Sequence, residues 1–129
     1  MRYLIDTNIL IWYIRNQKEF LRNNYNIIDN PENDIYISVI TIWEIALKTS
    51  KKLLDIGIDL NGLYHLIQNR KFILLPINQN HLEGILNLPP IHKDPFDRLL
   101  IATAKSENLP IITTDKCIHQ YDVDWIWKQ

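Results

Sequence analysis

Short apolar segments that favour β-strands alternate along this chain with segments of helical pattern. The five strand-like segments are Tyr3 to Ile5, Ile35 to Ser38, Phe72 to Leu75, Ile111 to Thr113 and Val123 to Ile126. Their length and their content of β-branched residues are typical of strands. Strands that alternate with helices build a parallel sheet with helices on both faces. We therefore predict an α/β fold with three α/β/α layers around a central parallel sheet of five strands.

Local signals mark where several helices begin and end. The expected N-caps and helices are Ser38 before Val39 to Ser50, Asp59 or Asn61 before a helix that ends near Arg70, and Asn78 before Gln79 to Leu88. The clearest helix follows Asp94, which is placed as the N-cap, with Pro95 at the favoured first position and Asp97 at the third. Asn108, followed by Leu-Pro, marks its end.

The composition narrows the class of protein. A length of 129 residues fits one domain and leaves no room for a second, so we expect a single domain over residues 1–129. The apolar share of 47% is that of a soluble globular protein. Cys117 is the only cysteine, which suits a reducing compartment, and without a signal peptide or membrane-spanning run we expect a cytoplasmic protein. A formal charge of −1 means that any affinity for phosphate must come from local clusters.

Two of the strand-like segments run directly into an aspartate. Asp6 follows the first and Asp115 follows the fourth. In open parallel sheets the ligand crevice lies beyond the carboxyl ends of the strands, so acids from separated strands converge there. Glu44 and Asp97, each inside an otherwise apolar helical stretch, are placed to join them. If all four meet, they form a carboxylate cage for a metal ion.

Each of these acids also has a simpler explanation. Asp6 and Asp115 suit turns and N-caps, and Glu44 stands four residues before Lys48, as in an exposed ion pair on a helix. Asp97 is favoured near a helix N-terminus by the helix dipole. Taken one at a time, these roles are as plausible as metal binding or more so. Four such coincidences in apolar surroundings favour the joint metal site, because a buried carboxylate is costly unless it is paired or coordinates a metal.

Four motifs of this chain resemble those of a known family. They are Asp6-Thr-Asn-Ile-Leu-Ile-Trp, Ser38-Val-Ile-Thr-Ile-Trp-Glu44, Asp94-Pro-Phe-Asp97-Arg-Leu-Leu-Ile-Ala and Thr113-Thr-Asp115. In this order and spacing they resemble PIN-domain ribonucleases, and most closely the VapC-like toxins of type II toxin–antitoxin modules. The resemblance implies that Asp6, Glu44, Asp97 and Asp115 hold Mg²⁺ or Mn²⁺. It implies supporting roles for Asn8, Ser38, Thr113 or Thr114, and Asp94.

The chemistry expected of such a site is hydrolysis of RNA. Oxygen ligands select hard ions such as Mg²⁺, and an ion of this kind activates a water against the scissile phosphodiester. The resemblance implies 5′-phosphate and 3′-hydroxyl products. Lys48, Arg98 and His92 are possible substrate contacts, with Lys51 and Lys52 on the same helix as Lys48, although a run of charge on a helix is usually just a solvated face.

Partners and competing functions follow mainly from the resemblance. It implies a homodimer and a cognate antitoxin, for which we consider the Phd/YefM type. A phosphoryl-accepting receiver domain and a haloacid-dehalogenase-like phosphatase would need acids that this chain lacks beside Asp6, and structure-specific DNA nucleases are generally longer. The main alternative is a non-catalytic module, binding nucleic acid or protein, that keeps the acidic site. The histidines at 81, 92 and 119 show no zinc-like spacing with Cys117.

Overall fold

Five parallel strands form one sheet at the centre of the computed structural model, which describes residues 1–129. The strands are β1 (Arg2–Ile5), β2 (Asp34–Ser38), β3 (Ile73–Leu75), β4 (Ile111–Ile112) and β5 (Trp125–Ile126). Their order across the sheet is β3-β2-β1-β4-β5, with Leu4 of β1 in register with Tyr36 of β2 and Ile111 of β4. All five predicted strands are therefore confirmed, with bounds that differ by one or two residues.

Seven α-helices and two short 3₁₀ turns connect the strands. They are α1 (Thr7–Ile14), α2 (Lys18–Leu21), α3 (Asn24–Asp29), α4 (Val39–Ser50), α5 (Leu60–Asn69), α6 (Gln79–Gly84), η1 (Ile85–Asn87), α7 (Pro95–Glu107) and η2 (Ile118–Gln120). The side chains of Ser38, Asp59, Asn78 and Asp94 cap α4, α5, α6 and α7 as predicted. The helix expected to run to Leu88 ends earlier as an α-helix, and its last turn is η1. The prolines at 89 and 90 then prevent any continuation.

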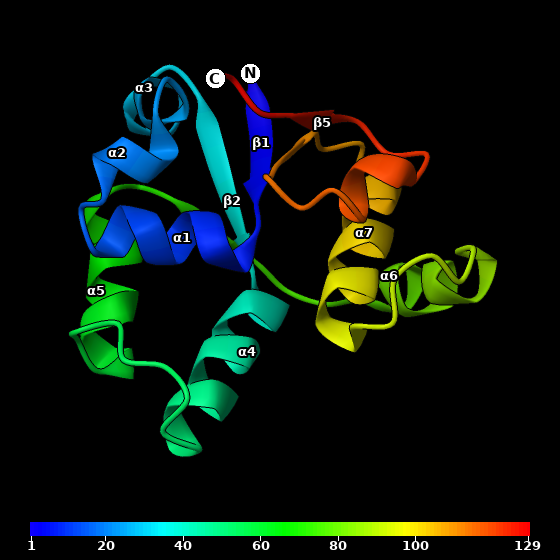
Figure 1. Ribbon diagram of the computed structural model, residues 1–129, viewed down its shortest axis with the longest axis horizontal. Helices are drawn as coiled ribbons and strands as arrows, with labels where there is room; N and C mark the ends of the chain where they lie inside the picture. The colour runs from blue at the N-terminus through cyan, green and yellow to red at the C-terminus, as the bar shows by residue number, and fades with distance from the viewer.

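Helices cover both faces of the sheet, as Figure 1 shows, with α1, α2, α3 and α5 on one side and α6 and α7 on the other. The strand side chains alternate between two apolar clusters. Ile5 and Ile112 belong to the cluster with α1 and α5, whereas Leu4 and Ile111 belong to the cluster with α7. These two cores on opposite faces confirm the three-layer α/β/α fold.

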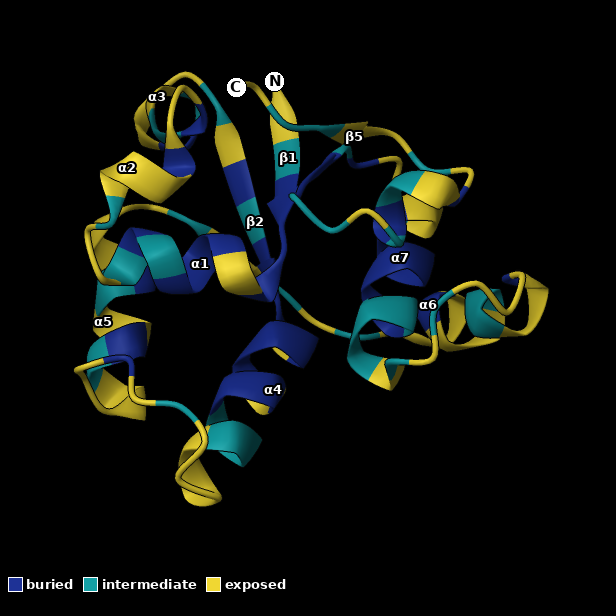
Figure 2. Cartoon of the chain, viewed as in Figure 1, coloured by how far each residue is buried: buried dark blue, intermediate teal, exposed yellow.

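The topology of the sheet concentrates polar residues at one end. The chain leaves β1 toward β2 on one side, and β4 later pairs with β1 on the other, so the strand order reverses between β1 and β4. Ligands of open α/β sheets bind beyond the carboxyl ends of the strands at such a point. Helix α4 begins directly after β2, and its first turns bury Ile40, Thr41, Ile42, Glu44 and Ile45 while Val39 and Trp43 stay exposed (Figure 2). None of the helices is both long and apolar enough to cross a membrane.

Candidate active site

Asp6 lies at the carboxyl end of β1 and is 5% exposed. Its Oδ1 accepts a hydrogen bond from the backbone N–H of Ile9 at 3.0 Å, so the capping role considered for this residue is real. Its Oδ2 accepts the hydroxyl hydrogen of Thr113, and that hydroxyl in turn accepts the backbone N–H of Asp115 at 3.0 Å. Capping therefore uses one carboxylate oxygen of Asp6, while the other belongs to a polar link between β1 and the end of β4.

Asp97 and Asp115 meet at the imidazole of His92. The Nε2 atom of His92 lies 2.8 Å from Oδ2 of Asp97 and 3.3 Å from Oδ2 of Asp115. The backbone N–H of Asp94 points at Nδ1 of the same ring at 3.3 Å, so we assign the proton of the neutral ring to Nε2. Helix α7 and the loop after β4 thus present their two aspartates to one side chain.

Glu44 approaches this end of the sheet from α4. Its carboxylate is buried, and the hydroxyl of Thr7 donates to Oε1 at 2.6 Å. The ammonium group of Lys48 lies 2.6 Å from Oε2, so the expected pair one helical turn apart is present. The Lys48 side chain is 44% exposed and the Glu44 side chain 8%, so this pair lies at the edge of the site and not on an open helix face.

The electrostatics of the site differ among the acids. Burial raises the pKa of Asp6 to about 6, and the charges of Asp115 and Glu44 add to this, while the hydrogen bond from Thr113 opposes it. Burial and then the charge of Asp94 raise the pKa of Asp97 to about 7, against the lowering effect of His92. The same shifts show that these carboxylates are close enough to repel one another. A cluster of oxygen donors with excess negative charge fits a hard divalent cation such as Mg²⁺.

Two of the predicted supporting residues act through backbone caps. Oδ1 of Asp94 accepts the N–H groups of Phe96 and Asp97 at 2.8 and 3.2 Å, which fixes the first turn of α7. The hydroxyl of Ser38 accepts the N–H of Ile40 at 3.1 Å and so helps to place the helix that carries Glu44.

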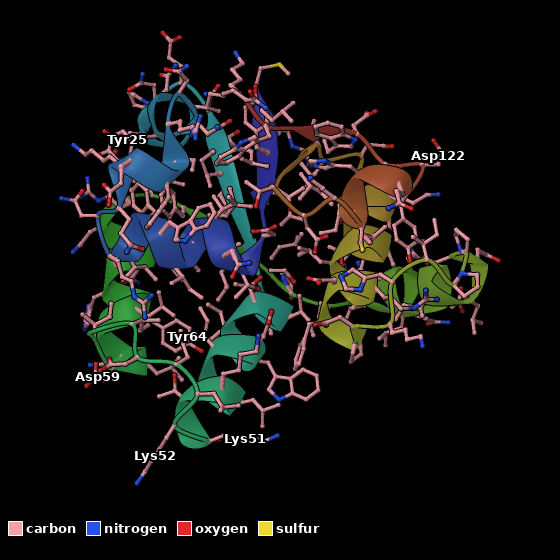
Figure 3. The ribbon with its side chains drawn as sticks, viewed as in Figure 1. Tyr25, Lys51, Lys52, Asp59, Tyr64 and Asp122 are labelled. Atoms are coloured by element: carbon pink, nitrogen blue, oxygen red, sulfur yellow. The ribbon has the colours of Figure 1, made fainter.

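Other predicted residues make no hydrogen bond to the acids. Asn8 is exposed on α1, and Thr114 lines a separate hollow beside Trp12 and Trp127. Of the two threonines considered, Thr113 is therefore the one that contacts the acidic site. Figure 3 shows Lys51 and Lys52 pointing into solvent at the far end of α4, away from the strand ends.

Arg98 binds the protein itself. Its guanidinium donates to the carbonyl of Pro89 at 3.0 Å and, over longer contacts, to the carbonyls of Ile85, Leu88 and His92. The Tyr121 hydroxyl also donates to the Pro89 carbonyl and accepts the N–H of His92 at 2.8 Å. Arg98 therefore organises the loop before α7 through both of its terminal nitrogens, and its contact with a substrate stays a prediction.

Sequence reasoning missed the threonines that hold Glu44. Thr7 donates to the carboxylate directly, and the hydroxyl oxygens of Thr7 and Thr41 lie 3.3 Å apart. Thr41 stands three residues before Glu44, so its place on the same helix face was available from the sequence. The contact from Thr7 could not be predicted from the sequence, because it depends on how α1 and α4 pack at the sheet edge.

Comparisons with known proteins support the same fold. The PIN domain family matches residues 3–124. The structure of VapBC2 from Rickettsia felis bound to a promoter DNA fragment superposes with a TM-score of 0.76 at 19% identity, covering 99% of this chain and 100% of that one. DNA-bound VapBC from Salmonella typhimurium superposes with a TM-score of 0.72 at 18% sequence identity, covering 98% of this chain and 97% of that one. FitAcB from Neisseria gonorrhoeae superposes with a TM-score of 0.64 at 24% sequence identity, covering 98% of this chain and 96% of that one. No curated protein matches the sequence.

Proposed function

Because the chain belongs to the PIN domain family, we propose that it is a metal-dependent endoribonuclease and the toxin of a type II toxin–antitoxin pair. The observation that carries the proposal is the convergence of Asp6, Asp97 and Asp115 from two strand ends and the first turn of one helix. Thr113 links the first acid to the third, and His92 links the second to the third. Such a site has the donors for a divalent cation and stands where this fold binds ligands.

The donor set favours Mg²⁺ or Mn²⁺ as the ion. The carboxylates of Asp6, Asp97 and Asp115 are the ligands we propose, with Glu44 as a fourth on the α4 side. All of these are oxygen donors, which suits hard cations. When bound there, the ion supplies positive charge against the phosphate and increases the acidity of a water nucleophile.

The remaining residues of the site orient these acids and the substrate. Thr113 fixes the oxygen of Asp6 that is not used for capping, and the Asp94 cap fixes the turn that carries Asp97. The hydrogen bond from Lys48 to Glu44 raises the pKa of Lys48, so this half-exposed ammonium group stays charged and can hold a backbone phosphate of RNA. His92 holds the two aspartates in one orientation and lies where a phosphate would approach them.

We propose partners for this chain by analogy with the related structures. The VapBC structures that this chain resembles pair two proteins, and two of them carry DNA. We propose a cognate antitoxin for this chain by the same arrangement, of the Phd/YefM type, together with a homodimer and a cytoplasmic location. We also propose that residues 1–129 act as one nuclease domain. Trp43, which is 57% exposed and packs edge-to-face on Phe96 next to the acids, offers an aromatic contact for such a partner.

Cleavage of a labelled RNA panel, including structured transfer RNAs, tests the proposal. Purified protein is incubated with Mg²⁺, Mn²⁺ or EDTA, beside Asp97→Asn and the control Asp122→Asn, whose side chain is exposed and points outward in Figure 3. We expect metal-dependent cutting that falls by about 100-fold or more in Asp97→Asn and persists in the control. Absence of cutting for every RNA, with no metal binding by calorimetry, would favour the alternative of a non-catalytic binding module.

A further inference from the structure

Three side chains of different chemistry meet beside the acidic site. His92, Asp115 and Cys117 each offer a ligand atom, and the three atoms lie within 4.8 Å of one another. All three side chains are partly buried. We propose that these residues bind a thiophilic transition-metal ion, Zn²⁺ in the first instance, at a second site that shares Asp115 with the hydrolytic centre.

The donor set determines the class of ion. A thiolate, an imidazole and a carboxylate are ligands of Zn²⁺, whereas Mg²⁺ takes oxygen ligands and does not favour sulfur. Three protein ligands leave one position of a tetrahedral ion for water. Ligand atoms around Zn²⁺ stand about 3.4 to 3.8 Å apart, given bonds of roughly 2.0 to 2.3 Å. His92 Nε2 and Asp115 Oδ2 already lie 3.3 Å apart, so the closure required is at most about 1 Å and falls on the contacts of the Cys117 sulfur.

The surrounding hydrogen bonds prepare the three side chains for this closure. Oδ1 of Asp115 accepts the N–H of Cys117 at 2.8 Å, which leaves Oδ2 facing Nε2 of His92 at 3.3 Å. The contacts of Arg98 and Tyr121 described above hold the loop that carries His92. The protein thus fixes the two backbone segments, and only side-chain rotation is required.

Zn²⁺ binding also requires that Cys117 and His92 give up the protons on their ligand atoms. The thiol proton of Cys117 passes to solvent, because the thiolate is the metal ligand. The Nε2 proton of His92 moves to Nδ1, so the ring stays neutral, at the cost of the 3.3 Å contact from the Asp94 N–H and of the 2.8 Å contact between Nε2 and Asp97. The first contact is long for a hydrogen bond and its loss is a small penalty, so the bonds to the ion must offset mainly the loss of the Asp97 contact.

The second site has a regulatory consequence that rests on the proposed function. An ion held by His92 and Asp115 removes the imidazole from Asp97 and occupies a carboxylate of the hydrolytic centre. Stoichiometric Zn²⁺ is therefore expected to inhibit Mg²⁺-dependent cleavage. The variant Cys117→Ser is expected to cleave normally in Mg²⁺ and to resist this inhibition.

The site is tested with Co²⁺ as a spectroscopic substitute for Zn²⁺, on the full chain freed of metal. We expect a thiolate-to-cobalt charge-transfer band that saturates at one ion per chain and disappears when Zn²⁺ is added. Cys117→Ser should abolish the band, and His92→Asn should weaken Zn²⁺ binding by at least about tenfold. The matched control His65→Asn, an exposed histidine on α5, should behave as the original chain does.

A second measurement needs no substitution. Because Cys117 is the only cysteine, alkylation by iodoacetamide reports on this one thiol, and Zn²⁺ should protect it until EDTA is added. Absence of both the band and the protection, or unchanged Zn²⁺ affinity in a folded Cys117→Ser variant, would overturn the proposal. These readouts do not depend on RNA cleavage, so failure of the second site and failure of the nuclease proposal give different results.

Discussion

The two sides of the acidic site compensate their buried charge in different ways. On the α4 side, Glu44 has a hydrogen-bond donor on each carboxylate oxygen, Thr7 on one and the cationic Lys48 on the other. On the strand-end side, Asp6 and Asp97 face other acids, and His92 is the only basic side chain that contacts any of the three aspartates. Both sides lie at the same end of one sheet, so this difference comes from local sequence and not from the fold.

Burial is the largest cause of the raised pKa of Asp97, and the capping motif of α7 adds to it. Asp94 must be an acceptor to cap the helix, and the same cap brings its charge toward Asp97, three residues later. Helix α4 is capped instead by the neutral hydroxyl of Ser38, and it carries its own cation one turn beyond Glu44. The comparison indicates that the uncompensated negative charge is concentrated at Asp6, Asp97 and Asp115, while the charge of Glu44 is balanced by Lys48.

The largest expected effect is on the pH dependence of stability without metal. The pKa values of about 6 for Asp6 and about 7 for Asp97 lie above the ordinary 3.8. The folded chain therefore binds more protons than the unfolded chain between about pH 4 and pH 7, and these two groups lower the free energy of unfolding as the pH rises through that window. The total is several kcal/mol, since each pKa unit corresponds to about 1.4 kcal/mol.

Urea unfolding in EDTA at a series of pH values measures this effect. Asp97→Asn should gain stability relative to the original chain as the pH rises from 4 to 7. Saturating Mg²⁺ should flatten the difference, because the cation replaces the missing positive charge. A stability difference for Asp97→Asn that stays constant across this range contradicts the assignment of charge strain to the strand-end side.

A smaller effect is expected when the cation on the α4 side is removed. Lys48→Met leaves the buried Glu44 carboxylate with Thr7 alone, and we expect a loss of about 2 kcal/mol, less than for a fully buried pair because Lys48 is partly exposed. Added Mg²⁺ should then stabilise the variant more than the original chain. Thermal unfolding with and without Mg²⁺ is the measurement, and Lys51→Met, at the exposed end of α4, is the control. Equal losses in the two variants would mean that the Glu44 pair contributes nothing specific.

Much of the fold was predictable because its signals are local. Each predicted cap depends on a side chain within three residues of the group it binds, and each strand is a short apolar run. The short helices α2 and α3 were not predicted, because their stability depends on distant contacts. Buried Asn24, for example, donates to the carbonyl of Lys128 at 2.6 Å and accepts its N–H at 2.8 Å.

Some features of the candidate site were also predictable from the sequence, and others were not. The strand-end positions of Asp6 and Asp115 follow from the sequence because topology alone brings strand ends together. The position of His92 between two aspartates, and the engagement of Arg98 by loop carbonyls, depend on how the loop before α7 folds back on itself. That path is set by many weak contacts, and no spacing in the sequence encodes it. The metal-binding roles of the four acids remain predictions.

The smallest expected effect concerns the link between the two strand ends. Thr113→Val keeps the shape of the side chain but removes the donor to Asp6 and the acceptor for the Asp115 N–H, and we expect a loss of about 1 kcal/mol in the free energy of unfolding. The adjacent Thr114→Val is the matched control and should stay within about 0.5 kcal/mol. Because the Thr113 hydrogen bond lowers the pKa of Asp6, its removal should move that pKa further above its ordinary value, which carboxyl NMR titration measures directly. An unchanged Asp6 titration would show that the hydroxyl does not stabilise the charged carboxylate, and that the two strand ends are held together by the backbone alone.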